Sequence, residues 1–228
     1  MIYNNKYTMD NKIGMRSEIM IKEYKTLLKS REAEIVIEKS RFIGYCAPVS
    51  SEDEALKFIE KIKAKHSDAT HNVSAYCIGL ENTIQRYNDD GEPSGTAGIP
   101  VLEVIKKEQL TNIVIVVTRY FGGIKLGGGG LIRAYTKGAK IAIDAGQIIS
   151  KKLHKIIQVS INYPLLGKVQ NEIMQTGYPI KEIKYEELVH LSIYVPLNER
   201  EKVIRQLIEW TNANCEISEG ENEFLTVP

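Results

Sequence analysis

The sequence lacks the features that mark secreted, membrane-spanning or strongly charged proteins. Its three cysteines, Cys46, Cys77 and Cys215, lie far apart and include no C-x-x-C pair, so we expect free thiols in a reducing compartment and no disulfide partner. No run reaches the roughly 18 apolar residues of a membrane span, and residues 1–20 hold no apolar core of a signal peptide. Together these absences predict a cytoplasmic protein with no membrane partner.

An excess of charge of either sign is also missing. The chain has 30 lysines and arginines against 29 aspartates and glutamates, a net charge of +1. The protein as a whole therefore has no general attraction for nucleic acid, and any site for an anion must come from a local concentration of charge. A length of 228 residues and a hydrophobic content of 43% are sufficient for one or two domains with buried cores.

The pattern of apolar residues changes near residue 150. We expect a flexible N-terminal extension at 1–19, a first domain at 20–150 and a second domain at 151–228. In the first domain the alternation and helical spacing of apolar residues predict two extended segments that meet near residues 38–40, further strands at 72–80, 83–91 and 112–120, and helices at 50–66, near Pro100 and at 131–146. The strand at 112–120 is apolar throughout, which is typical of a strand buried on both faces.

The second domain has a simpler rhythm of strand, helix, two strands, helix and strand. That order is the βαββαβ arrangement of ferredoxin-like domains, so the fold class is α+β. If both helices cover one face of a single sheet, six apolar residues should be buried there: Leu166, Val169, Ile173, Val203, Leu207 and Trp210.

A glycine-rich segment, TRYFGGIKLGGGGLIRAY (118–135), follows the apolar strand. Its spacing matches neither a P-loop nor a dinucleotide fingerprint, but a strand, a glycine loop and a helix start can present backbone N–H groups to an anion. No acidic residue occurs between Glu108 and Asp144, whereas five basic residues do. The candidate anion-binding residues are Arg119, Tyr120, Phe121, Gly122, Gly123, Lys125, Gly127, Gly128, Gly129, Gly130 and Arg133.

Two interpretations of this segment remain open. In the first it binds phosphates of a nucleic-acid backbone, and its aromatic residues stack on bases. In the second the glycines allow two elements to cross closely, the aromatic residues fill the core, and the basic side chains extend to solvent.

A second cluster of polar residues lies at 88–100. Its candidate residues, with a histidine that enters the preceding strand, are His71, Asp89, Asp90, Glu92, Ser94 and Thr96. Clustered carboxylates can hold Mg²⁺ beside a phosphate; they can also form a solvated turn, pair with the basic loop, or cap the helix near Pro100. The histidines match no zinc spacing and no nucleophile elbow is present, so we expect neither a cofactor nor a metal, with magnesium as the weaker alternative.

The segments DDGEPSGTAGIP (89–100) and VVTRYFGGIKLGGGGLIRAY (116–135) together resemble the signature of the YigZ/IMPACT family. The resemblance covers roughly residues 20–145 and implies a βαβ-rich first domain similar to one of ribosomal proteins and elongation factors. The second half resembles the C-terminal domain of bacterial YigZ proteins, which is similar to a domain of elongation factor G. Eukaryotic IMPACT proteins act through an N-terminal RWD domain; only about 20 residues precede the shared domain here, so we expect the bacterial two-domain type.

This resemblance implies a link to translation or its regulation. We therefore favour a protein that binds RNA or the ribosome through the basic glycine-rich loop. A magnesium-dependent phosphate-ester enzyme using Asp89, Asp90 and Glu92 is the alternative, and an adaptor for a protein partner is a further one. Binding is favoured over catalysis because the sequence offers no clear set of nucleophile, base and metal ligands.

Overall fold

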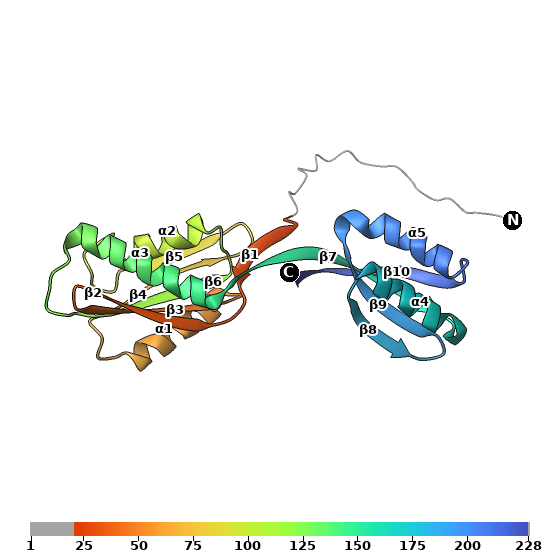
Figure 1. Ribbon diagram of the computed structural model, residues 1–228, viewed down its shortest axis with the longest axis horizontal. Helices are drawn as coiled ribbons and strands as arrows, with labels where there is room; N and C mark the ends of the chain where they lie inside the picture. The colour runs from red at the N-terminus through yellow and green to blue at the C-terminus, as the bar shows by residue number, and fades with distance from the viewer. Residues whose placement is uncertain (1–20, 228) are drawn as a thin grey trace.

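The computed structural model describes residues 21–227, so the extension expected at 1–19 lies outside the described residues. The chain forms two five-stranded sheets in which all strand pairs are antiparallel. The sheets lie toward opposite ends of an elongated molecule, and strand β7 runs between them (Figure 1). The predicted α+β class, with two domains of mixed structure, is confirmed.

The first sheet has the order β2-β3-β6-β4-β5. Its strands are β2 (Arg31–Ile37), β3 (Ser40–Pro48), β4 (His71–Ile78), β5 (Ile84–Asn88) and β6 (Ile113–Tyr120). The hairpin between β2 and β3 turns at Glu38 and Lys39, whose φ angles of 46° and 63° match the primed turns that join twisted strands. Since β3 and β4 are both antiparallel to β6, which lies between them, the helix that connects β3 to β4 completes a split βαβ unit.

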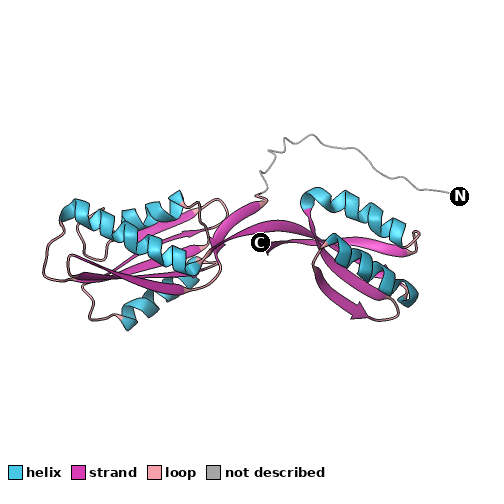
Figure 2. Ribbon diagram, in the orientation of Figure 1, coloured by secondary structure: helices cyan, strands magenta, loops and turns pink. Residues whose placement is uncertain are grey.

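Helices cover both faces of the first sheet (Figure 2). Helix α1 (Glu52–Lys65) lies on one face; α2 (Gly98–Lys107) and α3 (Gly127–Gly146) lie on the other. Alternate residues of β6 enter the two cores: Ile113, Ile115 and Val117 face α2 and α3, while Val114 and Val116 face α1. The prediction of a strand buried on both faces is thus confirmed.

Helix α3 lies directly on the sheet because glycines face each other at the crossing. A Cβ on Gly44 of β3 would stand 2.2 Å from the carbonyl oxygen of Gly138, and one on Gly138 would stand 2.9 Å from Val117 Cγ1. The helix also begins at Gly127, four residues before the predicted start at 131. The low helix propensity of glycine suggested a loop there, but the glycines form the first turn of a 20-residue helix that packing holds in place.

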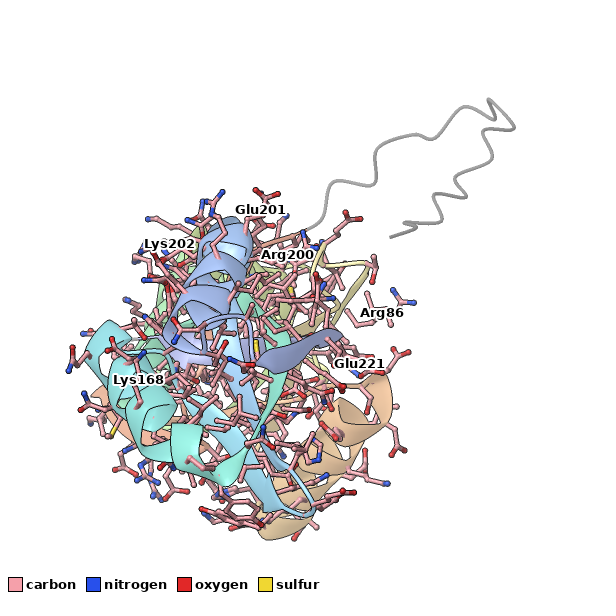
Figure 3. The ribbon with its side chains drawn as sticks, turned by 90° about the vertical axis from the view of Figure 1, so that its right-hand side faces the viewer. Arg86, Lys168, Arg200, Glu201, Lys202 and Glu221 are labelled. Carbon is pink, nitrogen blue, oxygen red and sulfur yellow. The ribbon has the colours of Figure 1, made fainter. Side chains whose placement is uncertain are left out.

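The second sheet has the ferredoxin-like order β10-β7-β9-β8. Its elements are β7 (Ile148–Ile161), α4 (Tyr163–Thr176), β8 (Ile180–Tyr185), β9 (Val189–Pro196), the short 3₁₀ turn η1 (Leu197–Glu199), α5 (Arg200–Trp210) and β10 (Cys215–Val227). Four of the six apolar residues expected in its core are fully buried, whereas Leu166 and Trp210 are partly buried at its edge. Lys168, which projects from α4 in Figure 3, donates to the carbonyl oxygen of Trp210 at 2.7 Å and so joins α4 to the end of α5.

Strand β1 (Glu23–Leu27) was not predicted, and it connects the two halves of the molecule. It pairs with the start of β7, from Lys152 to Ile148. Strand β9 pairs with the same edge of β7, but with the later residues 154–161. The other contacts of β1 are with the first half: Lys25 O accepts from Thr111 N at 3.0 Å, and Leu27 is buried in the core beneath α3. We keep 20–150 and 151–228 as the proposed domains, with β1 and the start of β7 as their connection.

A buried histidine ends helix α1. His66 Nε2 lies 2.6 Å from Tyr45 Oη, its Nδ1 lies 2.8 Å from Tyr120 Oη, and Tyr120 in turn donates to Asp68 at 3.0 Å. Because an ionised carboxylate only accepts hydrogen bonds, Tyr120 receives its other bond from Nδ1–H, and Nε2 accepts from Tyr45. Burial lowers the pKa of His66 below its usual value, and the nearby charge of Lys65 adds to this.

This histidine is expected to make the fold less stable in mild acid. Below about pH 6.5 the unfolded chain binds a proton at His66. In the folded chain the pKa of His66 is lowered, so the proton binds only at lower pH. The contribution of His66 to the free energy of unfolding is therefore lost as the pH falls. Urea unfolding at pH 7 and pH 5.5 measures the loss, which should be smaller in His66→Gln. An identical loss in both proteins would assign the acid sensitivity to other groups.

Candidate functional site

A cavity of about 330 Å³ opens where β6 ends and α3 begins. It brings together two segments that lie apart in the sequence, because the glycine-rich and the acidic segments both contribute to its wall. The lining residues are Thr70, His71, Glu92, Pro93, Arg119, Phe121, Lys125, Leu126, Gly127, Gly128 and Leu131. Thr70, Pro93, Leu126 and Leu131 were not anticipated, since no sequence pattern marks an apolar wall.

An ion pair forms the buried floor of this cavity. Glu92 Oε1 accepts hydrogen bonds from Arg119 Nη1 at 2.6 Å and from Tyr135 Oη at 2.7 Å. The side chains of Arg119 and Glu92 are 7% and 3% exposed, and charges buried to this degree require a partner. Burial, and then the bond to Glu92, raises the pKa of Tyr135 well above its usual value, so its hydroxyl remains a donor.

Arg119 therefore differs from the free cation that its place in a basic loop suggested. Its positive charge is compensated by Glu92, and its guanidinium group lies near two rings, 5.5 Å from the centre of Phe42 and 5.4 Å from that of Phe121. The buried Nε has no hydrogen-bond partner among the described residues. A buried N–H group without an acceptor lowers the stability of the fold. A ligand that supplied an acceptor to this atom would remove that penalty.

The other two carboxylates of the acidic segment have separate structural roles. Asp89 accepts hydrogen bonds from the amides of Gly95, Ala97 and Gly98 at 3.0, 3.1 and 2.7 Å and so caps the start of α2, one of the alternatives left open by the sequence. Asp90 accepts from the amide of Asn72 at 2.6 Å and pairs with Lys63.

The three carboxylates consequently do not converge on one point. Within residues 21–227 no three histidine, cysteine, aspartate or glutamate side chains are grouped so that they could hold a metal ion. The magnesium alternative thus receives no support from this geometry. His71 Nδ1 donates to the carbonyl oxygen of Asp90 at 2.8 Å, and its Nε2 lies 3.7 Å from Glu92 Oε1.

Ser94 and Thr96 also differ in position. Ser94 is exposed and is absent from the cavity wall, whereas Thr96 donates to the carbonyl oxygen of Pro93 at 2.6 Å and its Cγ2 lies 3.8 Å from the Cβ position of Gly128. Thr96 therefore borders the first turn of α3.

The first three glycines of the loop are explained by the fold itself. A Cβ on Gly122 would stand 2.0 Å from the carbonyl carbon and oxygen of Lys39, so the β2–β3 turn packs against it. Gly123 and Gly127 have φ angles of 85° and 68°, which favour glycine. This part of the loop agrees with the interpretation of a close crossing.

Gly128 and Gly129 have no such explanation. Both are exposed and helical, and neither is among the glycines with positive φ. A Cβ on Gly128 would meet no atom closer than 3.8 Å, and one on Gly129 none closer than 3.6 Å, which are ordinary contacts. Glycine within a helix costs about 0.5–1 kcal/mol relative to alanine, and here the protein derives no packing benefit from it; Gly130 is intermediate, with Leu126 Cβ at 3.0 Å.

The basic side chains around this turn fall into two groups. Arg119 pairs with Glu92, and Lys140 pairs with Glu108 and Asp144, each at 2.9 Å. Lys125, Arg133 and Lys137 are exposed and form no ion pair with any residue of the described chain. Arg133 Nη1 lies 3.6 Å from the Cβ position of Gly129, so this guanidinium group lies close to the first turn of its own helix.

The two aromatic residues at the end of β6 lie in different environments. Phe121 lines the cavity and is 46% exposed. Tyr120 packs on the α1 side of the sheet and bonds to His66 and Asp68. Of the pair proposed from the sequence, only Phe121 is placed to contact a ligand in the cavity.

The cysteines do not contribute a nucleophile to this site. Cys46 and Cys77 are buried, and burial raises the pKa of each thiol to about 11, which leaves them protonated at neutral pH. Cys215 lies on β10 of the second sheet, and all three are free.

In the part of the chain that the structure describes, no helix is both long and apolar enough to span a membrane.

Comparison with protein families finds two matches that follow one another along the chain. Residues 38–143, which include the whole cavity, match the Impact N-terminal domain, and residues 159–214 match a domain of unknown function, DUF1949. Among solved structures, one titled "Crystal structure of an hypothetical protein" is similar with a TM-score of 0.57 and 27% identity, over 89% of this chain and 99% of that one.

Curated relatives agree with the family matches. The chain is 49% identical over 206 residues to "IMPACT family member YvyE" of Bacillus subtilis, covering 90% of this chain and 95% of the relative. It is 30% identical over 185 residues to "IMPACT family member YigZ" of Escherichia coli, covering 79% and 90%. "Protein IMPACT" of Rattus norvegicus is 35% identical over 100 residues, 42% of this chain and 31% of the relative. The resemblance seen in the two signature segments is confirmed: the chain belongs to the IMPACT family and is of the two-domain bacterial type.

Proposed function

We propose that this protein binds single-stranded RNA, free or on the ribosome, through the first turn of α3, in a role in translation or its regulation. The observation that carries the proposal is the pair of exposed helical glycines, Gly128 and Gly129, which neither the backbone conformation nor packing requires. Glycine at such positions permits a ligand to approach the main chain closely.

The backbone donors at this helix start support an anion as that ligand. The first N–H groups of a helix have no intrahelical acceptor, and the residue before α3, Leu126, provides no side-chain cap. The first turn contains no acidic residue, so nothing in it offsets the partial positive charge at the N-terminus of this helix. A phosphate oxygen can accept from these amides.

The uncompensated cations support a phosphate backbone over a small neutral ligand. Lys125 precedes the turn and the guanidinium group of Arg133 lies beside it, so two positive charges flank the amides in a chain with a net charge of +1. Such local charge favours a polyanion at this face. The role in translation is inferred from the IMPACT family, because the resemblance to that family implies a link to translation or its regulation.

The salt dependence of binding tests this proposal. If Lys125 and Arg133 neutralise two phosphates, the logarithm of the affinity for single-stranded RNA should fall with the logarithm of the salt concentration at a slope of about −1.4 from these contacts. Changing both residues to alanine should remove that part of the slope, as measured by fluorescence anisotropy over a series of salt concentrations.

The matched control removes the same net charge elsewhere. Lys61 on α1 and Arg205 on α5 are exposed, and their replacement by alanine should leave the slope unchanged. If both double variants change the slope equally, binding depends on total charge and the proposed site is wrong.

A further inference from the structure

The cavity beside the first turn of α3 has an inner part that differs chemically from its rim. At the rim stand the helix amides and Lys125; at the floor stands the carboxylate of Glu92, which is 3% exposed. Because the guanidinium group of Arg119 is already paired with this carboxylate, the floor offers no free positive charge to a second phosphate. The interior is therefore suited to a neutral group, although the entrance is suited to an anion.

The floor also offers polar atoms that are not fully used. Both Arg119 and Tyr135 donate to Oε1 of Glu92, which leaves Oε2 without a hydrogen bond to a described residue. Arg119, 5% exposed, lines the cavity with a buried Nε that has no partner. Glu92 and Arg119 both line the cavity, so its wall offers an acceptor and a donor to a ligand that carries both kinds of polar group, as a nucleobase edge does.

The wall provides a surface for a flat ring. Phe121 is 46% exposed at the cavity mouth, its amide is held by Thr70 Oγ1 at 3.0 Å, and the guanidinium group of Arg119 lies 5.4 Å from the centre of its ring. Phe121 is thus fixed in position although nearly half of its surface is open. Aromatic side chains in such positions stack on unpaired bases.

We propose that the cavity holds one unpaired nucleobase of a strand whose phosphate binds the first turn of α3. The inference rests on the proposed function, because the phosphate contact brings the base to the cavity mouth. A volume of about 330 Å³ is at the small end of the range for ligand pockets, which suits a single ring system. A base in a duplex is stacked and paired on both sides, so only an unpaired base can enter.

The test compares a labelled six-nucleotide RNA strand with an abasic ribose-phosphate strand of the same length, using the full chain. The RNA should bind about tenfold more tightly, since base stacking on an aromatic side chain contributes roughly that much. Phe121→Ala should reduce the affinity for the RNA to nearly that for the abasic strand, while the affinity for the abasic strand stays unchanged. The matched control is Ile124→Ala, because Ile124 is 37% exposed in the same loop but does not line the cavity.

Each outcome decides a separate point. Equal affinities of the wild-type protein for the two strands would overturn the base site and leave the proposed function intact. Binding to neither strand would overturn the proposed function as well. A nucleoside monophosphate that binds as tightly as the strand would show that the site serves free nucleotides, and the strand form of the proposal would be wrong.

Discussion

Replacing Glu92 by alanine is expected to lower the free energy of unfolding by about 3–5 kcal/mol. The change would leave the guanidinium group of Arg119 buried without its counter-charge and the hydroxyl of Tyr135 without its acceptor. A buried charge that loses its partner keeps the full cost of desolvation. Urea unfolding of the variant and the wild-type protein at pH 7 measures the difference.

An exposed pair of the same residue types provides the control. Glu34 accepts from Arg41 Nε and Nη2 at 3.0 and 2.7 Å, but both side chains are 50% exposed. Glu34→Ala should therefore cost no more than about 1 kcal/mol. If Glu92→Ala costs no more than Glu34→Ala, the floor of the cavity is not the closed, charge-compensated structure described above.

Much of the fold follows from local patterns of sequence. The order of strands and helices in the second domain was predicted from the sequence of its apolar segments, and the helix expected at 50–66 is α1, whose N-cap Ser51 accepts from the amide of Glu54 at 3.3 Å. Strand β1 could not be predicted in this way. Its five residues, EYKTL, carry no strong pattern, and the strand exists because it pairs with β7 more than one hundred residues later.

The candidate site was predicted in its parts but not in its connections. The glycine-rich and acidic segments were both identified from sequence, and they share one cavity. The pairing of Glu92 with Arg119 was not foreseen, because 27 residues separate them and only the packing of β6 against the loop after β5 brings them together. The basic composition of the loop suggested that Arg119 is a free cation. The structure differs because the guanidinium group of Arg119 is buried and pairs with the carboxylate of Glu92.

Changing both Gly128 and Gly129 to alanine should separate stability from binding. Alanine favours the helix by about 0.5–1 kcal/mol at each position, and the new methyl groups meet only ordinary contacts at 3.8 and 3.6 Å, so the variant should be at least as stable as the wild-type protein. The same methyl groups would occupy the space through which a phosphate approaches the amides. Loss of even one charged hydrogen bond of this kind should weaken RNA binding about tenfold or more.

Gly167 on α4 provides the matched control for this pair. It is exposed and helical, and a Cβ there would have no atom within 4 Å. Gly167→Ala should therefore stabilise the protein in the same way without changing its affinity for RNA. The comparison distinguishes a local effect at α3 from a general effect of adding helix-favouring residues.

The most direct measurement is the affinity of the Gly128→Ala/Gly129→Ala protein for single-stranded RNA, taken with its free energy of unfolding in the same buffer. A tenfold or greater loss of affinity in a protein that is as stable as the wild type, or more so, is the expected result. An unchanged affinity in such a protein would contradict the claim that the main chain of this turn contacts the ligand.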